Sequence, residues 1–315
     1  MERYTKLSTY LKSIFGERVY KISLDGGFTC PNRDGTISRG GCIFCNESGS
    51  GEHTFCGSIK EQMEKGIEFA VSRNKGNKFI AYFQSFTSTY APKLTLKSRY
   101  REALFDDRVV GLAIATRPDC IDEEVCKTIK EVAGERLVWV ELGLQTSNET
   151  TAIKINRGYT NEVFERAVKL LRSYDIQVVV HLIVGLPSES HLDFINSVKY
   201  IANLGVDGVK FHSLYVEDGT KLAKLYLDGL YRPIEQDEYV KSVCDAIALL
   251  PKSVVIHRLT GDGEKTKLIA PLWTKNKKQN LNAITKHLID NDIIQGCRVR
   301  RNKILWKRLK ITKRR

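Results

Sequence analysis

The sequence lacks any long apolar run. No stretch of its 315 residues approaches the about 18 consecutive apolar residues that a transmembrane helix needs. The opening segment, MERYTKLSTYLKSIFGERVY, also lacks the apolar core of a secretory signal. We therefore expect a cytoplasmic protein with no membrane partner. Neither GxGxxG nor GxxxxGK[ST] follows the first predicted strand, so a Rossmann or P-loop nucleotide site has no support.

The eight cysteines do not indicate a disulfide framework, because cytoplasmic thiols stay reduced. Three of them cluster in the segment CPNRDGTISRGGCIFC, from Cys30 to Cys45. Its Gly, Pro, Asn and Asp residues predict a loop, and loops often carry function. The other five are scattered, and we expect them to be small, partly buried apolar residues: Cys56, Cys120, Cys126, Cys244 and Cys297.

Short β-branched runs alternate with helical patterns along most of the chain. The runs are almost continuously apolar, which is typical of parallel strands covered by helices on the outside. A series of six βα units predicts either an α/β barrel or an open doubly wound sheet. The predicted strands are 19–24, 78–83, 109–116, 136–142, 176–184 and 207–214.

Polar or Gly-rich residues follow every one of these strands. Examples are Gln84 after the second strand, Gln145 after the fourth and Gly185 after the fifth. In a barrel the carboxyl ends of the strands share one face, where the active site lies. An open sheet would concentrate such residues at one switch point. The even distribution therefore favours a barrel or partial barrel.

The pattern changes after about residue 250. We expect residues 1–250 to form the partial barrel and residues 251–315 to form a small C-terminal extension with a basic tail. The net charge is +13, and residues 298–315 contain ten Lys and Arg with no Asp or Glu, which leaves +3 (13 − 10) for the rest. A tail of this kind, with Trp306 inside it, suits a nucleic acid better than a membrane.

The three clustered thiols allow two interpretations. A structural zinc site needs four ligands, and Cys56 could be the fourth, although the resulting spacing is unusual for zinc. A [4Fe–4S] cluster normally takes four cysteines, so three would leave one iron open to a small molecule. S-adenosylmethionine radical enzymes need that arrangement. The loop follows the first strand, so a cluster would lie on the catalytic face, where Phe44 would shield it from water.

Several longer segments carry a resemblance. YKISLDGGFTCPNRDG, GGCIFCNESGSGE, AYFQSFTSTYAP, WVELGLQT, INRGYT, HLIVGLPSE and GVKFHSLYVEDGTKL are similar to segments of radical S-adenosylmethionine (SAM) proteins of the YhcC/YtqA type. This group is related to the Elongator catalytic subunit and to coproporphyrinogen oxidase-like radical SAM proteins. The resemblance implies a partial (β/α)6 TIM-like barrel, a [4Fe–4S] cluster on Cys30, Cys42 and Cys45, and S-adenosyl-L-methionine as the second cofactor. The first gap of this cluster motif is wider than the common C-x3-C-x2-C pattern.

The resemblance also implies cofactor contacts. Gln145 matches a polar residue that contacts the cofactor, and Arg157 matches an arginine that pairs with its carboxylate. His181 corresponds to a position that reaches the ribose, and Gly185 belongs to a turn that lets the backbone approach the adenine. The usual Gly-Gly-Glu-like motif is absent after the second strand, where Gln84 and Thr87 stand as candidates.

The resemblance suggests a tRNA substrate, contacted through the basic tail 298–315, and an external electron donor. The reaction it suggests converts 5-carboxymethylaminomethyl-uridine at the wobble position toward 5-aminomethyl-uridine. Two alternatives remain from the sequence. One is a radical SAM enzyme that acts on a small molecule, and the other is a non-enzymatic zinc-binding protein that binds RNA.

Overall fold

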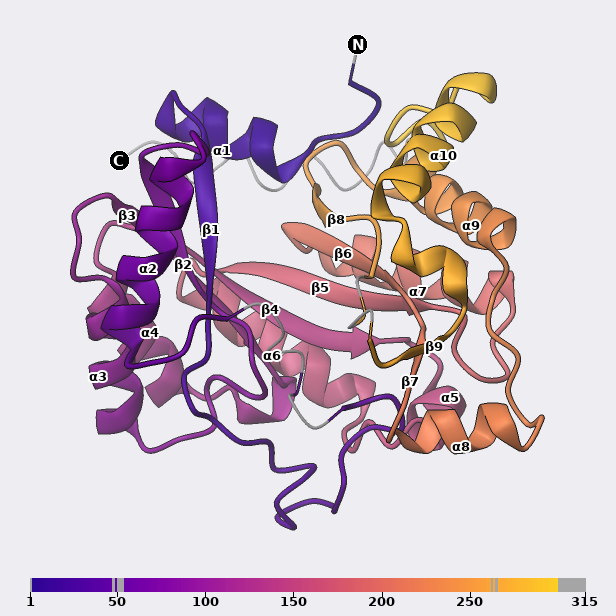
Figure 1. Cartoon of the computed structure of the whole chain (residues 1–315), viewed down its shortest axis with the longest axis horizontal. Helices are drawn as coiled ribbons and strands as arrows, with labels where there is room; N and C mark the ends of the chain where they lie inside the picture. Colours follow the sequence, from indigo (N-terminus) through magenta and orange to yellow (C-terminus); the bar gives the residue numbers. More distant parts are fainter. Residues whose placement is uncertain (1, 47–48, 50–53, 262, 264–265, 300–315) are drawn as a thin grey trace.

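The computed structural model describes residues 2–46, 49, 54–261, 263 and 266–299. Within these residues, seven parallel strands form one sheet in the order β1-β2-β3-β4-β5-β6-β8. From β1 to β6, neighbours in the sheet are consecutive strands of the chain, and β8 adds the last strand beside β6, so the twisted sheet curls into a half-barrel (Figure 1). The strands are β1 (Val19–Leu24), β2 (Lys78–Phe83), β3 (Val109–Thr116), β4 (Leu137–Gln145), β5 (Gln177–Val184), β6 (Gly208–Ser213) and β8 (Val255–Arg258).

The predicted α/β partial barrel is confirmed. β1, β2 and β3 have the predicted bounds, and β4 extends beyond its predicted end at residue 142 to Gln145. The described sheet has one strand more than the six βα units predict, because β8 pairs in parallel with β6. This seventh strand comes from the segment that the sequence assigns to the C-terminal extension.

Helices cover the outer face of the half-barrel (Figure 1). Three begin with side-chain caps that satisfy free backbone N–H groups: Ser58 with Glu61, Asp122, and Ser190 with Asp193. Their apolar faces pack on the sheet in one continuous core that includes Phe83, Leu142, Val180 and Phe211. These helices are α2 (Ile59–Ser72), α3 (Lys93–Ala103), α4 (Glu123–Ala133), α6 (Asn161–Ser173), α7 (His191–Leu204) and α9 (Gln236–Leu249).

The inner face of the sheet is closed at one end by α1 (Leu7–Phe15), which packs against β1 and β8. Leu11 of this helix joins Ile80, Ala113, Trp139 and Val179 in an apolar cluster inside the barrel. Water is therefore excluded from the amino ends of the strands. The carboxyl ends lie at the opposite end, where the segment after β1 leaves the sheet (Figure 1).

The remaining elements lie around this core. α10 (Lys277–Asp290) packs against α9, and β7 (Val216–Glu217) pairs with β9 (Leu268–Ala270) in an antiparallel ribbon. α5 (Glu149–Lys154) and α8 (Lys221–Leu227) are short helices that follow β4 and β7, and two 3-10 turns are Pro118–Cys120 and Leu272–Lys275. No helix in the described part of the chain has the length and apolar character to cross a membrane.

Candidate active site

A cavity of about 460 Å³ opens at the carboxyl ends of the strands. All three clustered thiols line it, together with side chains from β1, β2, β3, β4, β5, β6 and β8. This is the face on which barrel enzymes place their active sites. Its lining includes Cys30, Cys42, Phe44, Cys45, Gln84, Thr87, Gln145, Arg157, His181, Lys210, His212 and Arg258.

The thiol loop is held by two asparagines from distant parts of the chain. Asn32 is fully buried, and its Nδ2 donates to the carbonyl oxygen of Asn156 at 2.7 Å. Asn156 in turn donates from its Nδ2 to the carbonyl oxygen of Gly41 at 2.8 Å. The wide gap between the first two cysteines therefore folds back onto the turn after α5. The C-x-x-C pair itself closes with a hydrogen bond from the amide of Cys45 to the carbonyl oxygen of Cys42 at 3.0 Å.

The thiols influence one another electrostatically. Burial, together with the nearby Cys45 and Cys30, raises the pKa of Cys42 to about 12 against the opposing charge of Arg117. Burial also raises the pKa of Cys45, while Arg33 opposes the rise. Cys42 and Cys45 therefore favour the protonated form until a positively charged group joins them.

The donor set fits an iron–sulfur cluster better than zinc. In the part of the chain that the structure describes, no three His, Cys, Asp or Glu side chains converge closely enough to hold a single metal ion. A structural zinc ion needs four ligands around one centre, and Cys56 is exposed and does not line the cavity. The ligands of a [4Fe–4S] cluster bind different irons, so thiols distributed along one cavity wall suit it.

The structure places most of the expected cofactor residues beside these thiols. Phe44, Gln145 and His181 line both the main cavity and a smaller adjoining one of about 120 Å³. Gln145 stands at a register shift between β4 and β5 and has a φ of 67°. This left-handed backbone at the end of a strand is a strained conformation of the kind found at functional sites. Gln84 lines the main cavity from the segment after β2.

Gly185 lies elsewhere. It borders a separate cavity of about 660 Å³ with Pro187 and Glu189, and its carbonyl oxygen accepts a hydrogen bond from Tyr231 at 2.8 Å. The structure therefore does not bring Gly185 into the cavity that contains the thiols. Its contact with the adenine stays a prediction.

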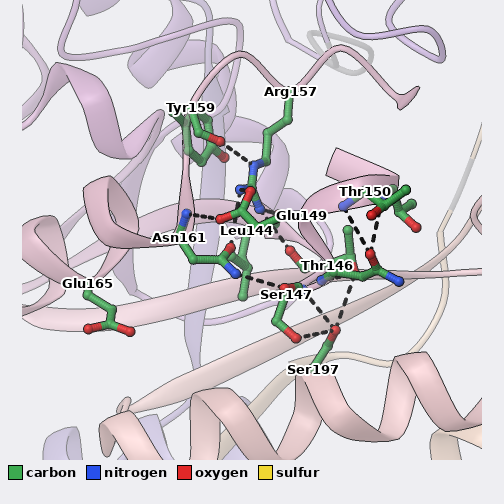
Figure 2. A network of polar contacts seen from close by, with 12 residues as sticks. Leu144, Thr146, Ser147, Glu149, Thr150, Arg157, Tyr159, Asn161, Glu165 and Ser197 are labelled. Carbon is green, nitrogen blue, oxygen red and sulfur yellow. Dashed lines mark hydrogen bonds and ion pairs between the residues drawn. The ribbon is translucent and has the colours of Figure 1, made fainter. Parts of the chain in front are cut away.

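Arg157 is buried, and its guanidinium is already fully engaged (Figure 2). Nε donates to the carbonyl oxygen of Tyr159 at 2.9 Å, and Nη1 donates to those of Leu144 and Thr146 at 3.2 and 2.8 Å. Nη2 donates to Glu149 and Asn161, both at 3.1 Å. All five N–H groups thus have protein acceptors. Pairing with a cofactor carboxylate, as the sequence predicts, requires one of these bonds to break, and the exposed Glu149 is the acceptor most easily released.

The sequence analysis missed a charged cluster at the bottom of the cavity. Glu141 of β4 is 1% exposed, and its Oε2 accepts from Tyr82 at 2.8 Å and contacts Nε2 of His181 at 2.9 Å. The same oxygen pairs with the ammonium of Lys210, which is 2% exposed. The signal was present in the sequence, because WVEL and GVKFH each place one charged residue inside an apolar strand.

The neighbours of this cluster determine its charge state. Burial alone would raise the pKa of Glu141, but Lys210 and Lys21 hold it well below its ordinary value. Burial lowers the pKa of His181 to about 4 and that of His212 well below the ordinary range. The cluster therefore contains an ionised carboxylate among neutral imidazoles at neutral pH.

Two family models match the chain. Residues 32–201 match the Radical SAM superfamily, and residues 206–290 match the Radical_SAM C-terminal domain. The chain is also similar to "Uncharacterized protein YtqA" of Bacillus subtilis, with 41% identity over 299 residues that cover 94% of this chain and 92% of the relative.

Two further likenesses are weaker. The tRNA uridine(34) acetyltransferase of Methanocaldococcus jannaschii is 29% identical over 179 residues, which cover 56% of this chain and 32% of that protein. The solved structure of Elp3 from Methanocaldococcus infernus matches with a TM-score of 0.71 at 18% identity, over 89% of this chain and 64% of that chain. At this identity the structural likeness shows the fold.

Proposed function

The chain belongs to the radical SAM superfamily, and we propose that it is a radical enzyme that modifies the wobble uridine of tRNA. The observation that carries the proposal is the meeting of three thiols with Gln145 and His181 in one cavity at the carboxyl ends of the strands. Members of this superfamily bind a [4Fe–4S] cluster and S-adenosylmethionine, and they need an electron donor.

Different residues of this chain would bind the cluster and S-adenosylmethionine. Cys30, Cys42 and Cys45 would bind the cluster, and Phe44 would keep water from it. Gln145 and His181 would contact S-adenosylmethionine from the walls of the same cavity. When bound, the cluster and S-adenosylmethionine supply the one-electron chemistry, which removes a hydrogen atom and one further electron from the substrate.

The reaction that we propose removes the carboxymethyl group from 5-carboxymethylaminomethyl-uridine. The methylene carbon between the amine nitrogen and the carboxylate loses the hydrogen atom and the electron, which leaves a double bond between this carbon and the nitrogen. Water adds to this bond and the carbon–nitrogen bond breaks. The amine remains on the uridine as 5-aminomethyl-uridine, the two carbons leave as glyoxylate, and one proton is released.

Two observations support a tRNA substrate. A partial relative is named for action at uridine 34 of tRNA, and residues 298–315 contain ten Lys and Arg. Such a density of positive charge suits a phosphate backbone. Residues 300–315 of this tail lie outside the described residues, and Arg298 pairs with Asp245 of α9.

The test compares tRNA nucleosides by mass spectrometry in cells with and without the gene. We expect 5-carboxymethylaminomethyl-uridine to accumulate without it, and the purified, anaerobically reconstituted protein to restore 5-aminomethyl-uridine in that tRNA. An unchanged nucleoside profile would overturn the tRNA proposal. Cleavage of S-adenosylmethionine without any change in tRNA would instead favour a small-molecule substrate.

A further inference from the structure

Three basic side chains lie close together at the bottom of the active-site cavity, where Lys210 and Arg258 line it and Lys21 lies beside Glu141. Lys21 belongs to β1, Lys210 to β6 and Arg258 to β8. β1 and β8 are the two edges of the curled sheet. Lys210 pairs in register with Arg258, and the Nζ atoms of Lys21 and Lys210 lie 4.0 and 4.5 Å from the centre of the Tyr82 ring inside the barrel. Burial is the largest cause that lowers the pKa of Lys21 and of Lys210, and the nearby Arg258 lowers both further. We call Lys21, Lys210 and Arg258 the basic floor.

One carboxylate balances the basic floor among the described residues that line the cavity, and it is Glu141. Its Oε2 pairs with Lys210, and its Oε1 accepts from Trp139 at 2.9 Å and lies 4.0 Å from Nζ of Lys21. Three basic side chains thus share one carboxylate, and burial lowers the pKa of Lys210 and of Lys21, so a further anion in this space would favour their charged forms. A buried charge without a counter-charge is unfavourable.

A further polar group faces the same space. Nε2 of His212 is buried and has no hydrogen-bond partner among the described residues, although its side chain lines both cavities. His212 lies on β6, two residues beyond Lys210, so both side chains point to the interior of the barrel. A buried imidazole nitrogen without a partner is one that a ligand atom or a water can satisfy.

We propose that the basic floor binds a carboxylate group of the substrate. This inference rests on the proposed function, and it assigns the carboxylate of the uridine substituent to the bottom of the cavity. A terminal carboxylate on a nucleobase substituent can reach groups that are 2% exposed, as Lys210 is. A backbone phosphate is flanked by two sugars and cannot descend to that depth.

The carboxylate of S-adenosylmethionine is the other anion to consider. Its amino acid end would bind beside the thiols in the loop after β1, since these thiols would hold the cluster. Lys21 and Lys210 each stand three residues before the end of their strands. The basic floor is thus on the far side of the cavity from the thiol loop, where Arg33 donates to Cys45 at 3.2 Å. The substrate carboxylate is the anion that fits the floor.

The test uses the reconstituted holoenzyme and the variants Arg258→Gln, Lys21→Gln and Arg258→Lys. The surface variant Lys127→Gln is the matched control, because it removes a cation from an exposed pair on α4. We expect Arg258→Gln and Lys21→Gln to raise KM at least tenfold for tRNA that carries the carboxymethyl group, and Arg258→Lys to recover most of the loss. Cleavage of S-adenosylmethionine without tRNA should change less than twofold. An equal loss in substrate-free cleavage would assign the floor to the cofactor carboxylate and overturn the proposal.

A second measurement does not need tRNA turnover, so it separates this proposal from the proposed function. Thermal unfolding of the holoenzyme is followed with increasing acetate or acetamide. A ligand that binds the folded state raises the unfolding temperature. We expect acetate to stabilise the wild type and Lys127→Gln, with a smaller shift in Arg258→Gln and Lys21→Gln and with no such difference for acetamide. Equal acetate shifts in all four proteins would refute a carboxylate site, whether or not the uridine is converted.

Discussion

Arg33 donates a hydrogen bond from Nη1 to the Sγ of Cys45 over 3.2 Å. The guanidinium also stacks on Phe86, 5.3 Å from the ring centre, which fixes its position beside the thiol. A positive donor to a cluster sulfur stabilises the reduced cluster more than the oxidised one. The charge of Arg33 should therefore raise the reduction potential of the bound cluster.

Arg33→Gln should shift that potential to more negative values, by an amount on the order of 50 mV. The measurement is a redox titration followed by electron paramagnetic resonance without S-adenosylmethionine. Arg39→Gln is the control, because Arg39 is an exposed cation of the same loop. Equal potentials in the wild type and Arg33→Gln would show that the contact does not influence the cluster.

The three thiols should be essential and Cys56 dispensable. Cys42→Ala should give a colourless protein that does not cleave S-adenosylmethionine, because one cluster ligand is lost. Cys56→Ala should keep its iron, sulfide and activity, since Cys56 is exposed and outside the cavity lining. Iron and sulfide analysis after anaerobic reconstitution checks both. A tightly bound zinc ion that disappears in Cys56→Ala would favour the zinc interpretation.

The buried pair of Glu141 and Lys210 should be important for stability. Lys210→Met leaves the carboxylate of Glu141, 1% exposed, without its main partner. We expect the free energy of unfolding to fall by about 3–5 kcal/mol, measured by anaerobic urea denaturation. Lys286→Met on the surface should change it by less than about 0.5 kcal/mol. The double variant Lys210→Met/Glu141→Gln should recover part of the loss, because the buried carboxylate that lacks its main partner is then removed.

Glu189 should make stability depend on pH. Burial raises the pKa of its carboxyl to about 6 from an ordinary value of 4.5, although Thr146 donates a hydrogen bond to it. The folded state then holds the proton more tightly than the unfolded state. The stability that Glu189 contributes is therefore full below pH 4.5 and is lost as the pH rises through 6. Glu189→Gln should unfold at higher urea concentration than the wild type at pH 8. The difference should shrink at pH 5, and a constant difference across this range would contradict the assignment.

The basic tail should supply affinity for RNA but not the radical chemistry. A deletion of residues 300–315 removes nine of the ten cations and keeps Arg298, which pairs with Asp245. Affinity for tRNA should fall, and the dependence of binding on salt should become weaker, because fewer counterions are released. Substrate-free cleavage of S-adenosylmethionine should stay unchanged. Binding titrations at several salt concentrations measure the effect, and an unaltered salt dependence would remove the tail from the interface.

The sequence predicted the strands well because parallel strands buried on both faces leave continuous apolar runs. The sequence did not reveal which inward-facing side chains of different strands contact one another. Lys21, Glu141 and Lys210 are far apart in the chain, and only the curl of the sheet brings their charges together. Each appears in the sequence as a single charge in an apolar run, which is not enough to identify a partner.

The thiol motif was predictable, whereas the path of its loop was not. The contact of Asn32 with Asn156 depends on where β4 and α5 place the turn that carries Asn156. The contacts of Arg157 were not predictable either. An arginine suits a cofactor carboxylate, but only the fold shows that five protein acceptors already bind its guanidinium. Gly185 borders a cavity separate from the one that the thiols line, and its contact with the adenine stays a prediction.

The anchor between Asn32 and Asn156 also sets an order of events during synthesis. The two residues are 124 positions apart, so the thiol loop leaves the ribosome long before its anchor exists. Until β4 and α5 have been made, the loop has only its local contacts, such as the hydrogen bond from the amide of Gly41 to the carbonyl oxygen of Asn32, to offset the entropy cost of its closure. The loop that carries the three cysteines gains its anchor only after the segment that follows the fourth strand has been synthesised.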